Sequence, residues 1–201
     1  MTTQTVLTGL GIFAVLAVAF ALLRPVAARF IAELGKGWNL GPTIDGKNYS
    51  TGSVNGNVIT VQDAHYITKA ATGPLTGTMS VTFNLSAPLT GTATPENGCG
   101  PAPATVTLYF QQAGDNWETD GKRWWAKFAT VTLDHAGDYT MTVPMDGAWT
   151  SVQDMTAANN PQAFADAKAN PSRVGFTIGN CTGLGHGGTG PAVLTIQSFN
   201  A

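Results

Sequence analysis

The chain has 201 residues, enough for one ordinary domain and a short additional segment. Charged residues make up 11% of it, against about 25% in typical soluble domains, and the formal net charge is −2. The hydrophobic fraction of 43% argues against a disordered chain. The basic residues form no cluster larger than Lys122 and Arg123, which argues against nucleic acid as a partner.

The N-terminal part contains an uncharged apolar run at residues 6–23. As a helix rising about 1.5 Å per residue, this run would be about 27 Å long, close to the hydrocarbon thickness of a bilayer. Residues 1–5 carry no basic side chain, and the run is long for a signal peptide. We therefore expect a retained transmembrane anchor. A signal peptide cleaved near Ala27 and Ala28 is the alternative.

Apolar residues continue at helical spacing from 26 to 34, which predicts that the helix reaches into the headgroup layer and ends at Gly37. We expect Arg24 and Arg29 at the membrane interface. Trp38 suits the same interface, and a core or linker position is equally consistent with the sequence. Residues 1–37 are thus expected to form an anchor with an interfacial extension, in contact with the lipid bilayer.

Two indications of membrane orientation disagree. Arg24, Arg29 and Lys36 all follow the apolar run, and the positive-inside rule then places the remaining chain in the cytoplasm. Low charge, abundant Thr and Gly, and two cysteines are typical of a domain outside the cytosol. We favour a single-pass protein of a bacterial inner membrane with its C-terminal domain in the periplasm, and the cytoplasmic orientation stays open.

Residues 38–52 are rich in Gly, Pro and Asn and are expected to form a connector to a mostly β domain at 53–201. Apolar residues take every second place at 79–83 and 139–143, which predicts half-buried strands. About eight such runs predict an antiparallel β-sandwich of jelly-roll type, with a closed barrel as the alternative. The runs lie at 58–61, 65–69, 76–84, 105–111, 124–133, 138–143, 173–178 and 192–199.

One short surface helix is predicted between these strands. Asn159 and Asn160 can cap its start, Pro161 suits its first turn, and Asn170, which precedes a proline, ends it. Phe164 and Ala167 are expected to face the sandwich. The helix closes one end of the fold and implies no chemistry.

The two cysteines, Cys99 and Cys181, are expected in loops, and neither belongs to a metal-ligand pattern. In an oxidising compartment a disulfide between them is expected. It would close a loop of about 80 residues and stabilise the fold by about 4 kcal/mol. Two free thiols are the alternative.

The sequence contains no recognisable catalytic or cofactor motif. His65, His135 and His186 have no ligand spacing between them, so no metal site and no cofactor are expected. No paired catalytic groups occur at a motif spacing. We therefore expect no enzymatic activity.

The strongest candidate for a binding surface is the loop at 114–121, which holds three carboxylates, an amide and an indole. Its oxygen atoms suit Ca²⁺, and the Trp117 indole beside polar groups suits a sugar; a solvated hairpin turn is the third interpretation. Trp124 follows the loop, and His186 lies in a Gly-rich segment where a purely structural role is the alternative. The candidate residues are Asp115, Asn116, Trp117, Asp120, Trp124 and His186.

Several short motifs occupy residues 105–199: LYFQQAGDNW at 108–117, RWW at 123–125, VP at 143–144, Trp149, FA at 164–165, NP at 170–171, RVGF at 173–176 and GHG at 185–187. In these motifs the chain resembles a group of uncharacterised bacterial exported proteins with a predicted jelly-roll domain like those of carbohydrate-binding modules. The resemblance implies a sandwich fold and an exported domain, and it implies no activity. The long anchor departs from that group and points to a membrane partner.

Two functions follow as hypotheses. The first is a non-catalytic accessory subunit of a larger integral membrane complex, for example photosynthetic or respiratory, held through the N-terminal helix. Gly9 and Gly11 leave room for helix packing there. The second is a cell-surface glycan-binding module in which Trp117, Trp124 or Trp149 stacks on sugars beside polar groups.

Overall fold

A computed structural model of the chain describes residues 37–44, 47–92, 102–180 and 185–201. Residues 38–201 form one unit by their internal contacts. The expected anchor, with Arg24 and Arg29, lies outside the described residues, as do Cys99 and Cys181. Within the described ranges, no helix is both long and apolar enough to cross a membrane.

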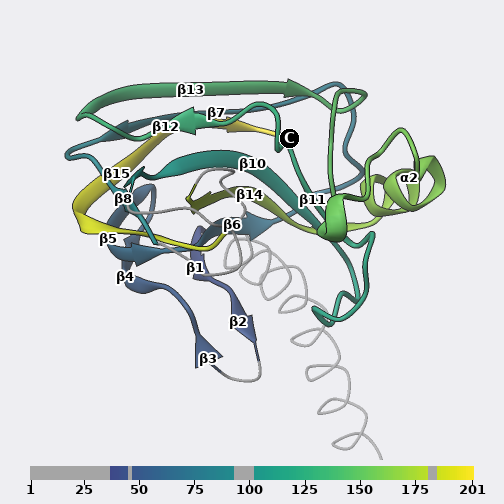
Figure 1. The fold of residues 1–201 in the computed structure, drawn as a ribbon, viewed down its shortest axis with the longest axis horizontal. Helices are drawn as coiled ribbons and strands as arrows, with labels where there is room; N and C mark the ends of the chain where they lie inside the picture. Colours follow the sequence, from purple (N-terminus) through teal and green to yellow (C-terminus); the bar gives the residue numbers. More distant parts are fainter. Residues whose placement is uncertain (1–36, 45–46, 93–101, 181–184) are drawn as a thin grey trace, which may run out of the picture. The chain divides into compact units, whose positions relative to one another are not determined.

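The described strands form two antiparallel sheets that lie one over the other (Figure 1). The first sheet has the order β1 (Asn39–Gly41), β6 (Tyr66–Ala70), β14 (Pro171–Gly179), β10 (Thr105–Gln112) and β11 (Arg123–Trp125), with β12 (Val131–Thr132) also paired to β10. The second has the order β13 (Gly137–Pro144), β7 (Thr78–Leu85), β15 (Gly188–Asn200), β5 (Val58–Ala64) and β4 (Thr51–Asn55). Smaller strands are β8 (Thr90–Gly91) on β15, β9 (Ala102–Pro103) on β8, and the hairpin β2 (Thr43–Ile44) with β3 (Lys47–Asn48).

The mostly β, antiparallel, sandwich-like fold predicted from the sequence is confirmed. Alternating burial along β7 and β13 matches the period of two in their sequences. Phe83 of β7 stacks on Phe176 of β14, with ring centroids 5.6 Å apart, and thereby joins the two sheets across the core. On its other side Phe83 stacks on Tyr139 of β13.

The chain enters the domain at a buried aromatic residue. Trp38 is 7% exposed and packs against Phe176 and Phe199, at centroid distances of 5.8 and 5.1 Å. Of the positions open to Trp38 in the sequence, the structure thus assigns it the core, because two aromatic rings surround its indole. Residues 38–52, expected as a connector, instead contribute β1, β2, β3 and the start of β4.

The run at 124–133, expected as one strand, is interrupted. β11 ends at Trp125, and the backbone amide of Ala129 donates to the carbonyl of Ala126 at 2.9 Å, which closes a turn. Phe128 within this turn is 74% exposed. The chain resumes pairing only at β12, so apolar content alone did not identify a continuous strand.

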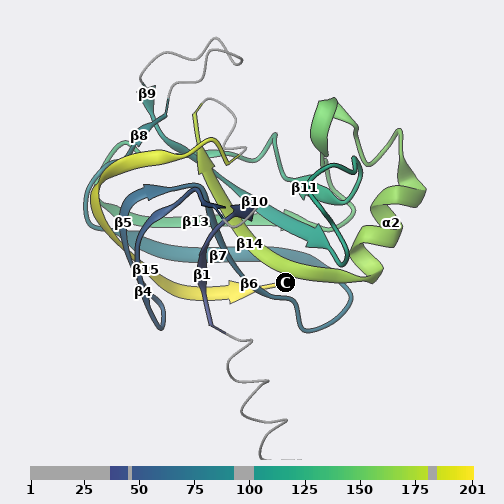
Figure 2. The same cartoon turned by 90° about the horizontal axis from the view of Figure 1, so that it is seen from below.

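The predicted helix is present as α2 (Pro161–Ala169), at one end of the sheets (Figure 2). Phe164 and Ala167 are buried, as expected, and the Phe164 ring contacts Trp124 at 4.9 Å. The expected capping bond from the Asn160 side chain is absent. Its amide nitrogen donates instead to the carbonyl of Thr156 at 3.3 Å.

Candidate functional site

A second cluster of aromatic side chains lies on the outer face of the first sheet. Side chains alternate between the two faces of a strand, so Leu108 and Phe110 of β10 enter the core while Tyr109 points away from it. There Tyr109 meets Tyr66 of β6 at 5.0 Å and Trp125 of β11 at 5.2 Å between ring centroids. Trp125 lies on the strand next to Tyr109, whereas Tyr66 lies two strands away across β14, and the three rings create an aromatic surface opposite the core.

The loop at 114–121 is held against this cluster by a buried ion pair. Asp115, whose side chain is fully buried, lies 3.1 Å from Nε of Arg123 through Oδ2. Its carboxylate also accepts hydrogen bonds from the Gln111 side chain at 2.8 Å and from the backbone amide of Trp117 at 3.0 Å. One carboxylate therefore joins the loop to β10 and β11.

Trp117 adopts a conformation that is unusual for a bulky residue. Its φ is +71°, a region that costs a non-glycine residue about 1–3 kcal/mol. The Arg123 guanidinium lies 5.1 Å from the indole and donates to the Trp117 carbonyl at 2.8 Å. The indole also meets Tyr66 nearly perpendicularly at 5.6 Å. These contacts compensate the backbone strain and bring the indole to the aromatic cluster.

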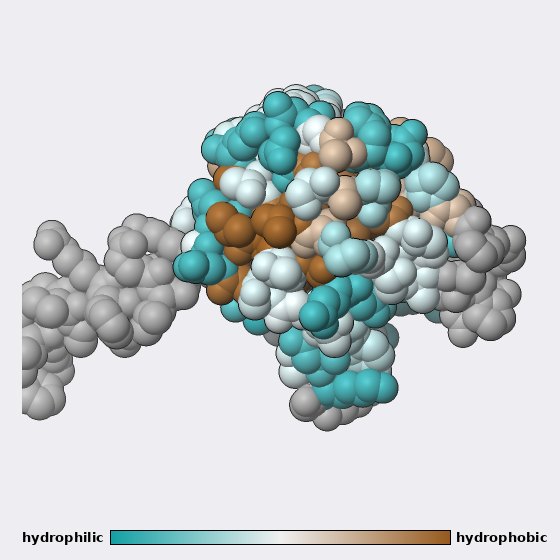
Figure 3. Space-filling model, turned by 90° about the vertical axis from the view of Figure 1, so that its left-hand side faces the viewer, coloured by the Kyte–Doolittle hydropathy of each residue, from teal (hydrophilic) through white to brown (hydrophobic). Residues whose placement is uncertain are grey.

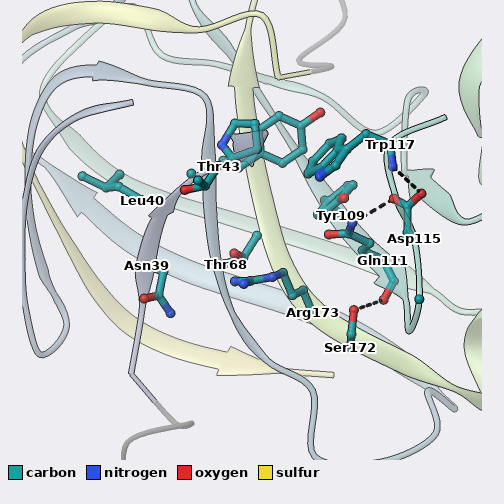
Figure 4. A pocket seen from close by; sticks show the side chains of 14 residues that line it. Asn39, Leu40, Thr43, Thr68, Tyr109, Gln111, Asp115, Trp117, Ser172 and Arg173 are labelled. Carbon is teal, nitrogen blue, oxygen red and sulfur yellow. Dashed lines mark hydrogen bonds between the residues drawn. The ribbon is translucent and has the colours of Figure 1, made fainter. Parts of the chain in front are cut away.

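Beside this cluster the surface is hollowed, with a cavity of about 330 Å³ (Figure 4). This volume lies within the usual range for small-ligand pockets, about 300–1,000 Å³. Side chains from β1, β6, β10 and β14 and from the loop line it. Tyr66, Tyr109 and Trp117 give it an aromatic side, and its polar lining includes Asn39, Thr68, Gln111, Ser172 and Arg173.

Several groups around the cavity are unusual in their polarity. The Tyr109 hydroxyl and the Trp125 indole nitrogen are buried, and neither has a hydrogen-bond partner among the described residues. Burial raises the pKa of the Tyr66 hydroxyl well above its ordinary value, partly offset by the nearby Arg123 charge, while Asp115 raises it further. Burial likewise raises the pKa of Tyr109. Both phenols are therefore neutral hydrogen-bonding groups across the physiological range.

The structure brings together only part of the candidate surface expected from the sequence. Asp115 and Trp117 line the cavity. Asn116 and Asp120 are exposed outside its lining, and Asn116 donates to Glu118 at 2.9 Å. The Asp115 carboxylate is already engaged, and the described residues contain no group of three or more His, Cys, Asp or Glu that could hold a metal ion.

The other two expected residues lie elsewhere. Trp124 is fully buried in the main core, where its indole nitrogen donates to the Gly121 carbonyl at 2.8 Å, so it has no face to offer a sugar. Trp149 is 1% exposed and is equally unsuited to stacking on a ligand. His186 is half-buried and does not line the cavity. The adjacent Gly185 carbonyl contacts the His65 ring instead, at 2.9 Å.

Sequence reasoning missed Tyr66, Tyr109 and Arg173. Tyr66 shares the outward face of β6 with Thr68, and Tyr109 shares that of β10 with Gln111. Arg173 pairs with Gln111 from β14. That alternation was available as a signal, but the order β6-β14-β10 that makes these residues neighbours was not. Comparison with protein-family models, curated proteins and solved structures gave no match. The resemblance to exported jelly-roll proteins stays a prediction.

Proposed function

We propose that the chain is a non-catalytic, membrane-anchored accessory subunit of a larger integral membrane complex. In this proposal the apolar run at 6–23 packs among the membrane helices of the complex, and the sandwich caps the complex on the periplasmic side. The sandwich is proposed to be a jelly roll. Its successive long strands support this, because β5, β6, β7, β10, β13, β14 and β15 alternate between the two sheets.

The observation that carries the proposal is the low charge of the second sheet. The strands β13, β7, β15, β5 and β4 of this sheet contain only two charged residues, Asp63 and Asp138. Asp138 accepts hydrogen bonds from two amides, those of Asn84 at 2.8 Å and Gln197 at 2.9 Å, so its charge is partly satisfied within the sheet. Protein–protein interfaces are depleted in Asp, Glu and Lys, and these strands are likewise poor in them.

The outer face of this sheet combines short polar and apolar side chains. Thr82 and Thr140 are hydrogen-bonded to each other at 3.2 Å across β7 and β13. Val58 and Val193 on the neighbouring β5 and β15 are 41% and 38% exposed. Figure 3 views the side on which β4, β5 and β8 lie in Figure 1, and apolar residues gather near its centre among polar ones. Such a surface can be covered by a partner at little desolvation cost.

Purification of the full-length chain in a mild detergent tests the accessory role. We expect it to co-purify in a fixed stoichiometry with integral membrane proteins and to migrate with them on a native gel. Thr140→Lys, which places a charge on the outer face of the second sheet, is expected to weaken this association, while Asn116→Lys in the exposed loop is the matched control. Migration of the wild-type chain alone, at its mass of 20.8 kDa, would contradict the proposal.

The cavity on the first sheet favours a second candidate function, the binding of a saccharide. Its aromatic side and its amide and hydroxyl lining match the two faces of a sugar ring, which are partly apolar and edged by hydroxyl groups. Binding of an oligosaccharide that is lost in Trp117→Ala would support this function. An accessory subunit can carry such a site, so the two functions are compatible.

A further inference from the structure

Two charged residues are among those that line the cavity, Asp115 and Arg173, and they differ in their ion pairing. Asp115 and Arg123 neutralise each other in the buried ion pair. Arg173, at the exposed end of β14, makes no ion pair with any described residue. Lys122 adds a second positive charge near the rim, where its ammonium group donates to the Gly114 carbonyl at 3.0 Å. Arg173 is therefore a positive charge in the lining without a counter-charge, while the exposed carboxylates of Glu118 and Asp120 lie outside the lining.

The position of Arg173 makes its guanidinium available to a ligand. In Figure 4 its side chain extends from β14 across the cavity toward Thr68 and Asn39, away from the aromatic side formed by Trp117. Its cross-strand neighbour on β10 is Gln111, whose side-chain amide already donates a hydrogen bond to Asp115. No carboxylate other than that of Asp115 is among the described residues that line the cavity. An anion entering the cavity would thus meet an uncompensated guanidinium and no exposed negative charge.

We propose that this cavity binds a saccharide that carries a carboxylate, such as a uronic acid residue. This inference rests on the second candidate function, saccharide binding, and specifies its ligand. The Arg173 fork pairs with the carboxylate through two parallel hydrogen bonds, a geometry that guanidinium groups favour. The sugar ring lies toward Tyr66 and Trp117, and its hydroxyl groups meet Asn39 and Thr68.

A saccharide fits these features better than an acidic peptide does. An Asp or Glu side chain would use Arg173 but would leave the aromatic side of the cavity without a contact. A flat ring with several hydroxyl groups uses the aromatic side, the hydroxyl and amide lining, and the guanidinium at once. The acidic peptide is therefore a comparison arm of the test.

The test titrates full-length protein in detergent with three matched probes and follows binding by calorimetry. The probes are a trimer of galacturonic acid, its fully methyl-esterified form and a trimer of galactose. We expect the free acid to bind at least tenfold more tightly than the other two, because charge-assisted hydrogen bonds are the strong ones. Arg173→Gln is expected to abolish this preference and Arg173→Lys to retain part of it. Lys47→Gln removes an exposed charge outside the lining and is the matched control.

Each outcome decides something different. Equal affinity for all three probes would overturn the carboxylate inference and leave saccharide binding standing. No binding of any probe would overturn both. Binding of an Asp-rich peptide with no binding of the galacturonate trimer would assign the cavity to an acidic protein segment and also overturn the inference. None of these results changes the co-purification test of the accessory role, which is independent.

Discussion

The buried ion pair between Asp115 and Arg123 allows a quantitative prediction for the substitution Asp115→Asn. The carboxylate forms an ion pair with the Arg123 guanidinium and accepts hydrogen bonds from the Gln111 amide and the Trp117 backbone amide. Asparagine can keep the bond from Trp117 through its remaining oxygen. Its amide nitrogen would then face two donors, and Arg123, whose side chain is 9% exposed, would lose its counter-charge.

Removing one partner of a buried ion pair costs about 3–5 kcal/mol, because the other charge is left without compensation. Since one of the two hydrogen bonds survives in Asp115→Asn, we expect a loss of about 3 kcal/mol of unfolding free energy. For a domain of this size that corresponds to a fall in the midpoint of thermal unfolding of roughly 6–12 °C. The loss is large against a total stability of about 5–15 kcal/mol, but the domain stays folded at moderate temperature.

The assay is urea unfolding of full-length protein in detergent, followed by tryptophan fluorescence. Asp154→Asn is the matched control, because Asp154 pairs with Lys127 at the surface with its side chain 78% exposed, and we expect a change below about 0.5 kcal/mol. Arg123→Met, alone and combined with Asp115→Asn, completes a double-mutant cycle. A coupling energy of about 2 kcal/mol is expected.

The role of the ion pair is refuted if Asp115→Asn destabilises the protein no more than Asp154→Asn does. It is also refuted if the double variant loses as much as the sum of the two single variants. Either result would mean that water reaches the carboxylate in solution and that the loop at 114–121 is not held by this pair.

Three further predictions concern other parts of the domain. Because the pKa of Tyr66 is raised in the folded state, its neutral hydroxyl contributes to stability below about pH 10, and this contribution is lost as the pH rises further. The free energy of unfolding, measured with urea at several pH values, should therefore fall less steeply above pH 10 in Tyr66→Phe than in the wild type. An unchanged slope would contradict this. Gly175→Ala would place a Cβ 2.1 Å from a backbone carbonyl oxygen of β6, so the free energy of unfolding from thermal unfolding should fall by about 2–3 kcal/mol. In the control Gly56→Ala the new Cβ meets open space, and the loss should be about 1 kcal/mol or less. If a disulfide joins Cys99 and Cys181, non-reducing mass analysis should find no free thiol. In the described residues, Gly91 lies close to Asn180, the residue before Cys181. Two thiols that titrate in the native protein would refute the bridge.

The sequence predicted those features of the domain that depend on neighbouring residues. Alternation at 79–83 and 139–143 identified β7 and β13, and Pro161 with the apolar Phe164 identified α2. The loop at 114–121 was found because its polar groups are dense in sequence. In each case the physical cause, side-chain periodicity or turn chemistry, acts over a few residues.

What the sequence did not predict depends on contacts between distant segments. Tyr66 and Tyr109 lie 43 positions apart in the sequence, and they meet because β6 and β10 both pair with the same strand, β14. The sequence did not indicate the ion pair between Asp115 and Arg123 either, because it forms between the loop at 114–121 and the strand that follows it. Trp38 lies in the core because it packs against Phe199, which is near the other end of the domain in the sequence.

The contact between Trp38 and Phe199 has a consequence for how the protein is made. Through these two rings the first and last parts of the domain are in contact. The final strand, β15, lies in the middle of the second sheet, between β7 and β5. β5 can pair with β4 and β7 with β13 earlier, but neither strand can complete its native pairing before β15 has been synthesised. The second sheet of the sandwich can thus close only after β15 has been synthesised, and the strands made before it wait with an unpaired edge.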